Sequence, residues 1–268
     1  MSLGTHTMKL RVTLIQQPLV WQDATANRER FKPLLTPLAG TTDIVVLPET
    51  FTTGFSMDVE RLAEQADGPT TQWLAGLAGK LNAAITGSVI TADGGRYYNR
   101  LLWATPSGEL RHYDKRHLFR MGREHEHFTP GRDAWCVEWR GMRICPLVCY
   151  DLRFPVFSRR RPELDYDVLI YVANWPAVRV YAWRQLLKAR AIENQAFVIG
   201  VNRVGADGSG VEYPGDSAAD DFLGQPLAEL GGTPSVTTVE LDATALQAFR
   251  KKFPAHLDAD RFTLALLS

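Results

Sequence analysis

The sequence predicts an α/β or α+β layered domain with buried sheets. Strand-like and helix-like segments alternate, several hairpins are present, and no internal repeat or low-complexity linker interrupts them. A chain of 268 residues, 45% of them hydrophobic, can bury roughly 70–75% of its unfolded surface in one core. Such a core needs no metal or disulfide to hold it. We therefore expect one domain over residues 8–268, and we interpret residues 1–7 as an expression leader before a natural start at Met8.

In the first half, side-chain periodicity defines the expected elements. Residues 9–16 alternate apolar and polar side chains, which is typical of a strand, and Asp23 is expected to cap a helix. Pro33 and Pro37 should kink or end that helix, because proline lacks an N–H and clashes with the preceding turn. Leucines at helical spacing predict a second helix over residues 70–82. Further strands are predicted at residues 43–47, 84–90, 97–104 and 110–113.

The second half again alternates strands and helices. Strands are predicted at residues 135–139, 142–148, 167–172, 197–202, 215–219 and 236–241, and helices near 154–160, 180–194 and 243–252. The dipeptide Arg140-Gly141 predicts a tight hairpin turn, whose register puts Cys136 opposite Cys145. We expect these two thiols to be reduced and partly buried.

Composition argues against two classes of partner. The chain carries 30 Lys and Arg against 30 Asp and Glu and has no basic cluster, so nucleic-acid binding is not expected. No apolar run approaches the roughly 18 residues of a membrane span. Residues 1–8 lack the basic start and apolar stretch of a secretory signal, and three cysteines are too few for a disulfide scaffold. We therefore expect a cytoplasmic protein.

Three apolar strands end in reactive side chains. Glu49, Lys115 and Cys149 each follow a predicted strand, although 66 and 34 residues separate them along the chain. Ligands of layered α/β proteins bind outside the carboxyl ends of strands. The sequence therefore predicts that a carboxylate, an ammonium and a thiol share one pocket.

This trio suits nucleophilic catalysis on an amide. A thiol is mostly neutral at pH 7 and needs a nearby base, and Glu49 is the candidate. The ammonium of Lys115 and the backbone N–H of Tyr150 would stabilise the negative oxygen that forms when the thiolate of Cys149 adds to the carbonyl. Ammonia would leave with a proton from the glutamic acid, and water activated by Glu49 would hydrolyse the resulting thioester.

The short sequence motifs around these residues resemble those of the nitrilase, or carbon–nitrogen hydrolase, superfamily. LPETFTTGF, YDKRHLF, CYDLRFP, ANWP and ARAIENQ occur in this order, and the resemblance extends essentially from Met8 to Phe262. It is nearest to the omega-amidase branch. The resemblance implies a four-layer αββα sandwich and a Glu–Lys–Cys triad at Glu49, Lys115 and Cys149.

The resemblance implies further features of the site. A second glutamate is expected after the lysine, and Glu124 matches it best, with Glu126 as the alternative. No cofactor or metal is expected. The implied substrates are the monoamides 2-oxoglutaramate and 2-oxosuccinamate, hydrolysed to the acid and ammonia, and the implied assembly is a homodimer or a larger homo-oligomer.

Four residues near the expected pocket are candidates for substrate binding. Tyr150 follows the nucleophile directly, and Arg153 could grip a substrate carboxylate with its planar fork, unless it pairs with Asp151 or Asp167. Asn174 and Trp175 end another strand, where the indole could stack on the substrate amide or serve only the core.

Three alternatives stay open at this point. The same triad would suit an N-carbamoyl amino acid hydrolase or a nitrile hydrolase. His112, His117, His125 and His127 lie within sixteen residues and would suit a metal-dependent hydrolase. A non-catalytic interaction protein on the same fold is the third, and the intact Glu, Lys and Cys argue against it.

Overall fold

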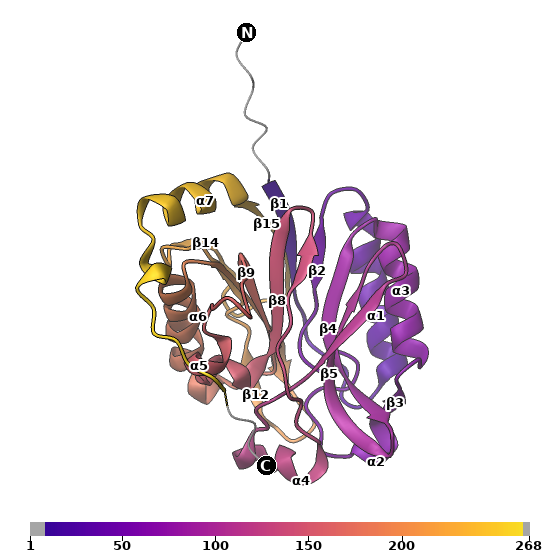
Figure 1. Cartoon of the computed structure of the whole chain (residues 1–268). Helices are drawn as coiled ribbons and strands as arrows, with labels where there is room; N and C mark the ends of the chain where they lie inside the picture. Colours follow the sequence, from indigo (N-terminus) through magenta and orange to yellow (C-terminus); the bar gives the residue numbers. More distant parts are fainter. Residues whose placement is uncertain (1–8, 265–268) are drawn as a thin grey trace.

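Two β-sheets stacked face to face occupy the centre of the computed structural model, which describes residues 9–264, and helices cover their outer faces (Figure 1). The expected leader at residues 1–7 and the start at Met8 lie outside the described residues.

The first sheet contains β1 (Lys9–Gln16), β2 (Ile44–Val46), β3 (Glu64–Gln65), β4 (Ala84–Asp93), β5 (Arg96–Ala104), β6 (Leu110–Asp114) and β15 (Ser235–Asp242). Its order is β15-β1-β2-β4-β5-β6, and β3 pairs with β4. Strand β1 is parallel to β2 and antiparallel to β15, so the sheet is mixed.

The second sheet contains β7 (Val137–Trp139), β8 (Met142–Val148), β9 (Val168–Ala173), β10 (Phe197–Asn202), β13 (Ala218–Asp220) and β14 (Pro226–Glu229), in the order β14-β13-β10-β9-β8-β7. Strands β8, β9 and β10 are parallel neighbours, so their carboxyl ends lie at one edge. A separate hairpin pairs β11 (Val204–Ala206) with β12 (Glu212–Pro214).

The helices are α1 (Ala24–Leu35), α2 (Val59–Leu62), α3 (Pro69–Leu81), α4 (Glu124–His127), α5 (Pro155–Ser158), α6 (Val180–Asn194) and α7 (Ala243–Lys252). Short 3₁₀ turns add η1 (Thr36–Leu38), η2 (Arg120–Gly122), η3 (Cys149–Arg153), η4 (Ala177–Arg179) and η5 (Ala255–Leu257). Helices α1 and α3 lie outside the first sheet, and α5 and α6 lie outside the second (Figure 1).

Side-chain alternation along β1 explains how the layers pack. Leu10 and Val12 belong to the core cluster between the sheets, together with Ile144 of β8, whereas Ile15 joins Phe31 of α1 in the cluster under α1 and α3. Successive side chains of a strand point to opposite faces, so one strand contributes to both layers.

Helix α6 approaches the second sheet closely because β10 carries a glycine under it. A Cβ at Gly200 would lie 2.5 Å from Cδ1 of Leu187 and 2.8 Å from the ring of Trp183. Both large side chains are fully buried. Glycine therefore lets the helix seat its apolar face directly on the strand.

The layered mixture of sheets and helices confirms the predicted α/β fold class. Strands β1, β8 and β10 and helices α6 and α7 have the predicted bounds, and Asp23 caps α1 by accepting a hydrogen bond from the N–H of Ala26 at 2.9 Å. Helix α1 continues past Pro33 and ends at Leu35, ahead of Pro37.

Several short elements differ from the prediction. The strand expected at 215–219 begins only at Ala218, because Gly215 and Asp216 have φ of +71° and +53° and form a turn. The helix expected near 154–160 is limited to α5, which follows η3. The sequence patterns did not indicate α2, α4, β3, β11, β12 or β14.

The predicted turn at Arg140-Gly141 joins β7 to β8. Both residues have positive φ, and Val137 pairs with Ile144, which is the predicted register. Strand β7 begins at Val137, so Cys136 precedes the ladder rather than belonging to it. Burial raises the pKa of Cys145 well above its ordinary value, and a hydrogen bond with Cys136 adds to the rise. Both thiols are free.

Among the helices of residues 9–264, none is long and apolar enough to cross a lipid bilayer.

Candidate active site

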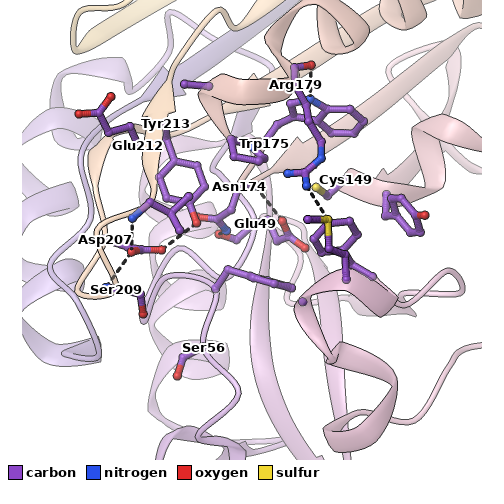
Figure 2. A pocket seen from close by; sticks show the side chains of 18 of the residues that line it. Glu49, Ser56, Cys149, Asn174, Trp175, Arg179, Asp207, Ser209, Glu212 and Tyr213 are labelled. Carbon is purple, nitrogen blue, oxygen red and sulfur yellow. Dashed lines mark hydrogen bonds between the residues drawn. The ribbon is translucent and has the colours of Figure 1, made fainter.

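A cavity of about 830 Å³ opens at the carboxyl ends of the central strands (Figure 2). Glu49, Lys115 and Cys149 line it, so the structure brings the three predicted strand-end residues to one place. Tyr150, Arg153, Asn174 and Trp175, the predicted substrate-binding residues, line it as well.

Glu49 lies two residues past Leu47, just after β2, and its buried carboxylate is held on both oxygens. Oε1 accepts hydrogen bonds from Nζ of Lys115 at 2.9 Å and from Nδ2 of Asn99 at 2.8 Å. Oε2 accepts the backbone N–H of Asn174 at 2.7 Å. These three donors fix the orientation of the carboxylate.

Lys115 directly follows β6, and two carboxylates flank its buried ammonium. Nζ lies 2.9 Å from Oε1 of Glu49 and 2.9 Å from Oε2 of Glu124. The backbone around it is held by Gly131, whose N–H donates to the carbonyl of Lys115 at 2.9 Å. A Cβ at Gly131 would lie 1.8 Å from the carbonyl oxygen of Asp114, so only glycine fits this approach.

Cys149 directly follows β8, at the first residue of η3, with a φ of +41°. The left-handed region is unfavourable for a residue with a side chain, and such strain persists only where neighbours enforce it. Asp151 is the neighbour that does so. Its Oδ2 accepts the N–H of Val148 at 3.0 Å and the hydroxyl of Tyr113 at 2.8 Å, and its Oδ1 accepts the N–H of His117 at 3.1 Å.

The charges of the site favour a neutral thiol beside a charged lysine. Burial opposes the ammonium of Lys115, but the carboxylates of Glu124 and Glu49 outweigh burial and raise the pKa of Lys115 above its ordinary value. Burial, followed by the charge of Glu49, raises the pKa of Cys149 well above its ordinary value, against the opposite effect of Lys115. Glu49 and Cys149 line the same cavity. The carboxylate of Glu49 is therefore the candidate acceptor for the thiol proton.

The two candidate second glutamates have different surroundings. Glu124 is buried at the start of α4, and its Oε2 accepts the N–H of Phe119 at 2.6 Å as well as the lysine ammonium. Burial raises its pKa, and Lys115 opposes the rise. Glu126 pairs with Arg123 at the surface. Only Glu124 contacts Lys115, and it does so from behind the cavity wall.

The predicted substrate-binding residues take different positions along the cavity lining. Nδ2 of Asn174 donates to the backbone carbonyl of Glu49 at 2.7 Å, so this side chain fixes the position of Glu49. Tyr150 packs edge to face on Phe119 with ring centroids 5.0 Å apart. The guanidinium of Arg153 lies 4.9 Å from the ring centroid of Trp175.

The alternative partners considered for Arg153 are engaged elsewhere. Asp151 holds the turn at Cys149, and Asp167 pairs with Arg250 at 2.6 Å. Within residues 9–264, Arg153 has no carboxylate partner. Its charge therefore faces the cavity beside the indole of Trp175.

Two residues of the site were not singled out from the sequence. Asn99, in the middle of β5, donates to Glu49 and to Oε1 of Glu124 at 3.1 Å. Arg179, at the end of η4, lines the cavity. Nothing in the periodicity distinguishes Asn99 from other polar strand residues. Arg179 lies close to the ANWP motif in the sequence, and this closeness could have identified it as a site residue.

The histidines do not gather at one point. His117 lies 2.7 Å from Asp151, His112 lies 4.0 Å from Asp114, and His125 and His127 are exposed on α4. Within residues 9–264, no three side chains of His, Cys, Asp or Glu are arranged to hold a metal ion.

A family model described as carbon-nitrogen hydrolase matches residues 11–251, around the arrangement just described. The chain belongs to the carbon–nitrogen hydrolase family. It is 48% identical over 256 residues to "Omega-amidase YafV" of Escherichia coli (strain K12), across 95% of this chain and 98% of that protein. It is 31% identical over 254 residues to "2-oxoglutaramate amidase" of Bacillus subtilis (strain 168), across 94% of this chain and 98% of that protein.

A solved structure supports the same assignment. XC1258 from Xanthomonas campestris, described as a CN-hydrolase superfamily protein with an arsenic adduct in the active site, superposes with a TM-score of 0.94. It shares 54% sequence identity, over 96% of this chain and 99% of that chain. These matches confirm the predicted family, its omega-amidase branch and the nitrilase-type αββα fold. This carbon–nitrogen hydrolase is therefore an enzyme that hydrolyses carbon–nitrogen bonds.

Proposed function

We propose that this enzyme hydrolyses the terminal amide of 2-oxo dicarboxylic acid monoamides, such as 2-oxoglutaramate and 2-oxosuccinamate, with Glu49, Lys115 and Cys149 as catalytic residues. The observation that carries the proposal is the buried ion pair of Glu49 and Lys115, which lines one cavity together with Cys149. The names of two relatives, an omega-amidase and a 2-oxoglutaramate amidase, support the substrate class.

The first half-reaction forms a thioester. Glu49 accepts the proton of the Cys149 thiol, and the sulfur adds to the amide carbon. Negative charge then develops on the carbonyl oxygen, where the ammonium of Lys115 and the N–H of Tyr150 stabilise it. Collapse breaks the C–N bond, and Glu49 returns the proton so that ammonia leaves.

The second half-reaction releases the acid. Ammonia departure makes room for water, whose proton Glu49 accepts as the water oxygen adds to the thioester carbon. The same donors stabilise the second oxyanion, and collapse breaks the C–S bond. The proton then returns to sulfur, and the neutral thiol is restored beside a charged glutamate.

Glu124 and Asn174 act as positioning residues in this proposal. Glu124 holds the ammonium of Lys115 from the side away from the cavity, and Asn174 holds the backbone and carboxylate of Glu49. Arg153 is the proposed partner of the substrate carboxylate, because it faces the cavity without a carboxylate of its own.

The triad is tested by replacing its members and following ammonia release. Cys149→Ala should abolish turnover while the circular dichroism spectrum and melting temperature stay near those of the wild type. A variant that keeps a tenth of the wild-type rate would contradict the nucleophile assignment. Cys145→Ala is the matched control, because this second buried thiol does not line the cavity.

The substrate class is tested on 2-oxoglutaramate, hexanamide, an N-carbamoyl amino acid and an aliphatic nitrile. The largest kcat/KM is expected for 2-oxoglutaramate. A preference for the N-carbamoyl compound or the nitrile would keep the triad and replace the proposed substrate. In the same assay, Arg153→Lys should lower kcat/KM for 2-oxoglutaramate about tenfold or more, because lysine lacks the bidentate fork, and should barely affect hexanamide.

A further inference from the structure

Several charged groups that line the cavity already have partners within the protein. Lys115 is paired with two carboxylates. The carboxylate of Asp207 accepts the N–H groups of Ser209 and Val211 and the hydroxyl of Tyr213 at 2.8–3.0 Å. The cations that lack a carboxylate among the described residues are therefore the ones available to a ligand.

Arg179 is such a cation, in addition to Arg153. Its Nη2 lies 2.7 Å from Sδ of Met121, and its guanidinium lies 5.3 Å from the ring centroid of Phe119. A thioether is a weak acceptor. A carboxylate entering the cavity would offer this guanidinium a far stronger one. Within residues 9–264, no acidic side chain competes for it.

Trp175 links the two arginines. Its Nε1 donates to the backbone carbonyl of Arg179 at 2.8 Å, and its ring carries the guanidinium of Arg153 at 4.9 Å. The indole itself is fixed, because it is buried and Asn202 bonds both the N–H and the carbonyl of its backbone, at 2.8 and 3.0 Å. One rigid aromatic side chain therefore contacts the guanidinium of Arg153 and the backbone of Arg179.

Two acidic residues of the lining lie away from Arg179. Asp207 and Glu212 belong to the segment of the β11–β12 hairpin, and Figure 2 shows them on the side of Tyr213, away from Arg179. Arg179 lies beside Trp175 in that view. In that view, Arg179 and these two acidic side chains therefore lie on different sides of the cavity.

We propose that Arg179 is a specificity-determining residue that, together with Arg153, forms a two-guanidinium site for the carboxylate end of the substrate. The inference rests on the proposed function and deepens it, since it assigns the anion-binding wall of the same cavity. A carboxylate has about four lone-pair sites, so it can accept from two forks at once. The preferred substrate is then a short amide with a carboxylate at the far end.

The test separates anion binding from catalysis. In the Cys149→Ala background, the affinity for 2-oxoglutarate is measured by calorimetry, with and without Arg179→Met. Affinity should fall by about tenfold to a hundredfold, as expected for loss of a charged hydrogen bond. Arg179→Lys keeps the positive charge but lacks the planar guanidinium group with its two parallel donors. Its affinity for 2-oxoglutarate should therefore fall less than that of Arg179→Met. An affinity within twofold of the parent for Arg179→Met would overturn the proposal.

Arg184→Met is the matched control. Arg184 lies five residues further along the chain and pairs with Asp216 at 2.8 Å, outside the cavity lining. Its replacement should leave 2-oxoglutarate affinity unchanged. An equal loss in the Arg184 variant would assign the effect to net charge and overturn a local site.

Turnover distinguishes failure of this inference from failure of the proposed function. With the nucleophile present, Arg179→Met should lower kcat/KM for 2-oxoglutaramate at least tenfold and for hexanamide less than twofold. Equal losses on both amides would leave the proposed reaction standing and overturn the role of Arg179. If 2-oxoglutarate binding depends on Arg179 but the wild type does not hydrolyse 2-oxoglutaramate, the anion-binding role of Arg179 would stand. The proposed reaction would then be wrong.

Discussion

Asn99 is the residue that joins the two glutamates of the site. Its Nδ2 donates to Oε1 of both Glu49 and Glu124, at 2.8 and 3.1 Å, while Lys115 lies between the same carboxylates. Two carboxylates so close together repel, and burial strengthens the repulsion. A neutral donor shared between them reduces this cost without adding another titratable group.

Replacing Asn99 with leucine should therefore make the pair of carboxylates hold a proton more tightly. The acidic limb of the pH profile of kcat/KM should move to higher pH, and kcat/KM at pH 7 should fall at least tenfold. Steady-state kinetics between pH 5 and pH 9 on the best amide would measure the shift.

Thr86→Val provides the comparison for Asn99→Leu. Thr86 is a buried residue of the adjacent strand β4, and its hydroxyl has no hydrogen-bond partner among the described residues. Its replacement should leave the profile in place. A profile of Asn99→Leu that coincides with the wild type, with only the amplitude reduced, would show that Asn99 serves folding and not the base.

The strand-end residues of the site were predictable because the pattern that reveals them is local. An apolar strand followed by Glu49, Lys115 or Cys149 is visible in a few consecutive residues, and the surrounding words then resemble one family. Asn99 has no such signature, since its importance comes from three partners that the fold brings to it. The placement of Arg153 against Trp175, and not against an aspartate, was likewise undecided by sequence.

At the scale of elements, the turn η3 depends on Asp151. This fully buried carboxylate accepts bonds from β8, from the hydroxyl of Tyr113 on β6, and from both the backbone and the ring of His117. It thereby ties the ends of strands from both sheets to the strained residue Cys149. The position of Cys149 relative to Lys115 follows from this link.

Asp151→Asn tests whether this turn needs the hydrogen-bond acceptors of the carboxylate or only a side chain of that volume. Asparagine has nearly the same volume but turns an NH₂ group toward N–H and O–H donors, which leaves at least one buried donor unpaired at about 1–3 kcal/mol. We expect a lower melting temperature and at least a tenfold loss of kcat, because the turn no longer holds Cys149 at its positive φ.

Tyr113→Phe removes one of the hydrogen bonds to Asp151. It should lower the melting temperature and kcat less than Asp151→Asn does. The pair of variants is measured by thermal denaturation and by single-turnover ammonia release. Wild-type kcat in a destabilised Asp151→Asn protein would mean that the turn keeps its geometry without this carboxylate.

The helices and strands that periodicity missed have four residues or fewer, although some short strands, such as β2, were predicted. Helices α6 and α7 match the expected bounds, because fifteen and ten residues give the apolar pattern several turns to show itself. The hairpin strands β11 and β12 are three residues each, too short for a period, and tertiary contacts such as the Tyr213–Asp207 bond hold them. The missed elements therefore include part of the cavity wall.

At the scale of the whole molecule, the stacked sheets bury a few carboxylates whose ionisation opposes folding. Asp220, at the end of β13, is 1% exposed, and its Oδ2 has no hydrogen-bond partner among the described residues. Burial raises its pKa to about 6, Lys188 at 3.4 Å opposes the rise, and the nearby charges of Glu229 and Asp221 add to it. This group lies outside the catalytic cavity, so it reports on stability alone.

The sign of its contribution follows from the direction of the shift. Between the ordinary aspartate pKa near 4 and about 6, the folded protein keeps a proton on Asp220 that the unfolded chain has lost. The free energy of unfolding therefore falls as pH rises through this window and is level above it. Asp220→Asn, which cannot ionise, should match the wild type near pH 4 and exceed it at pH 7 by up to about 2–3 kcal/mol.

Urea denaturation of the wild type and Asp220→Asn at pH 4, 5, 6 and 7 measures the difference directly. The stability gap should open between pH 4 and pH 6 and stay constant beyond, since only the difference in bound protons between folded and unfolded chains changes it. Asp258→Asn, at an exposed aspartate near the end of the described chain, should show no gap at any pH. A gap of constant size from pH 4 to pH 7 would mean that the asparagine acts through packing or hydrogen bonding, because a difference in ionisation must vanish where both side chains are neutral.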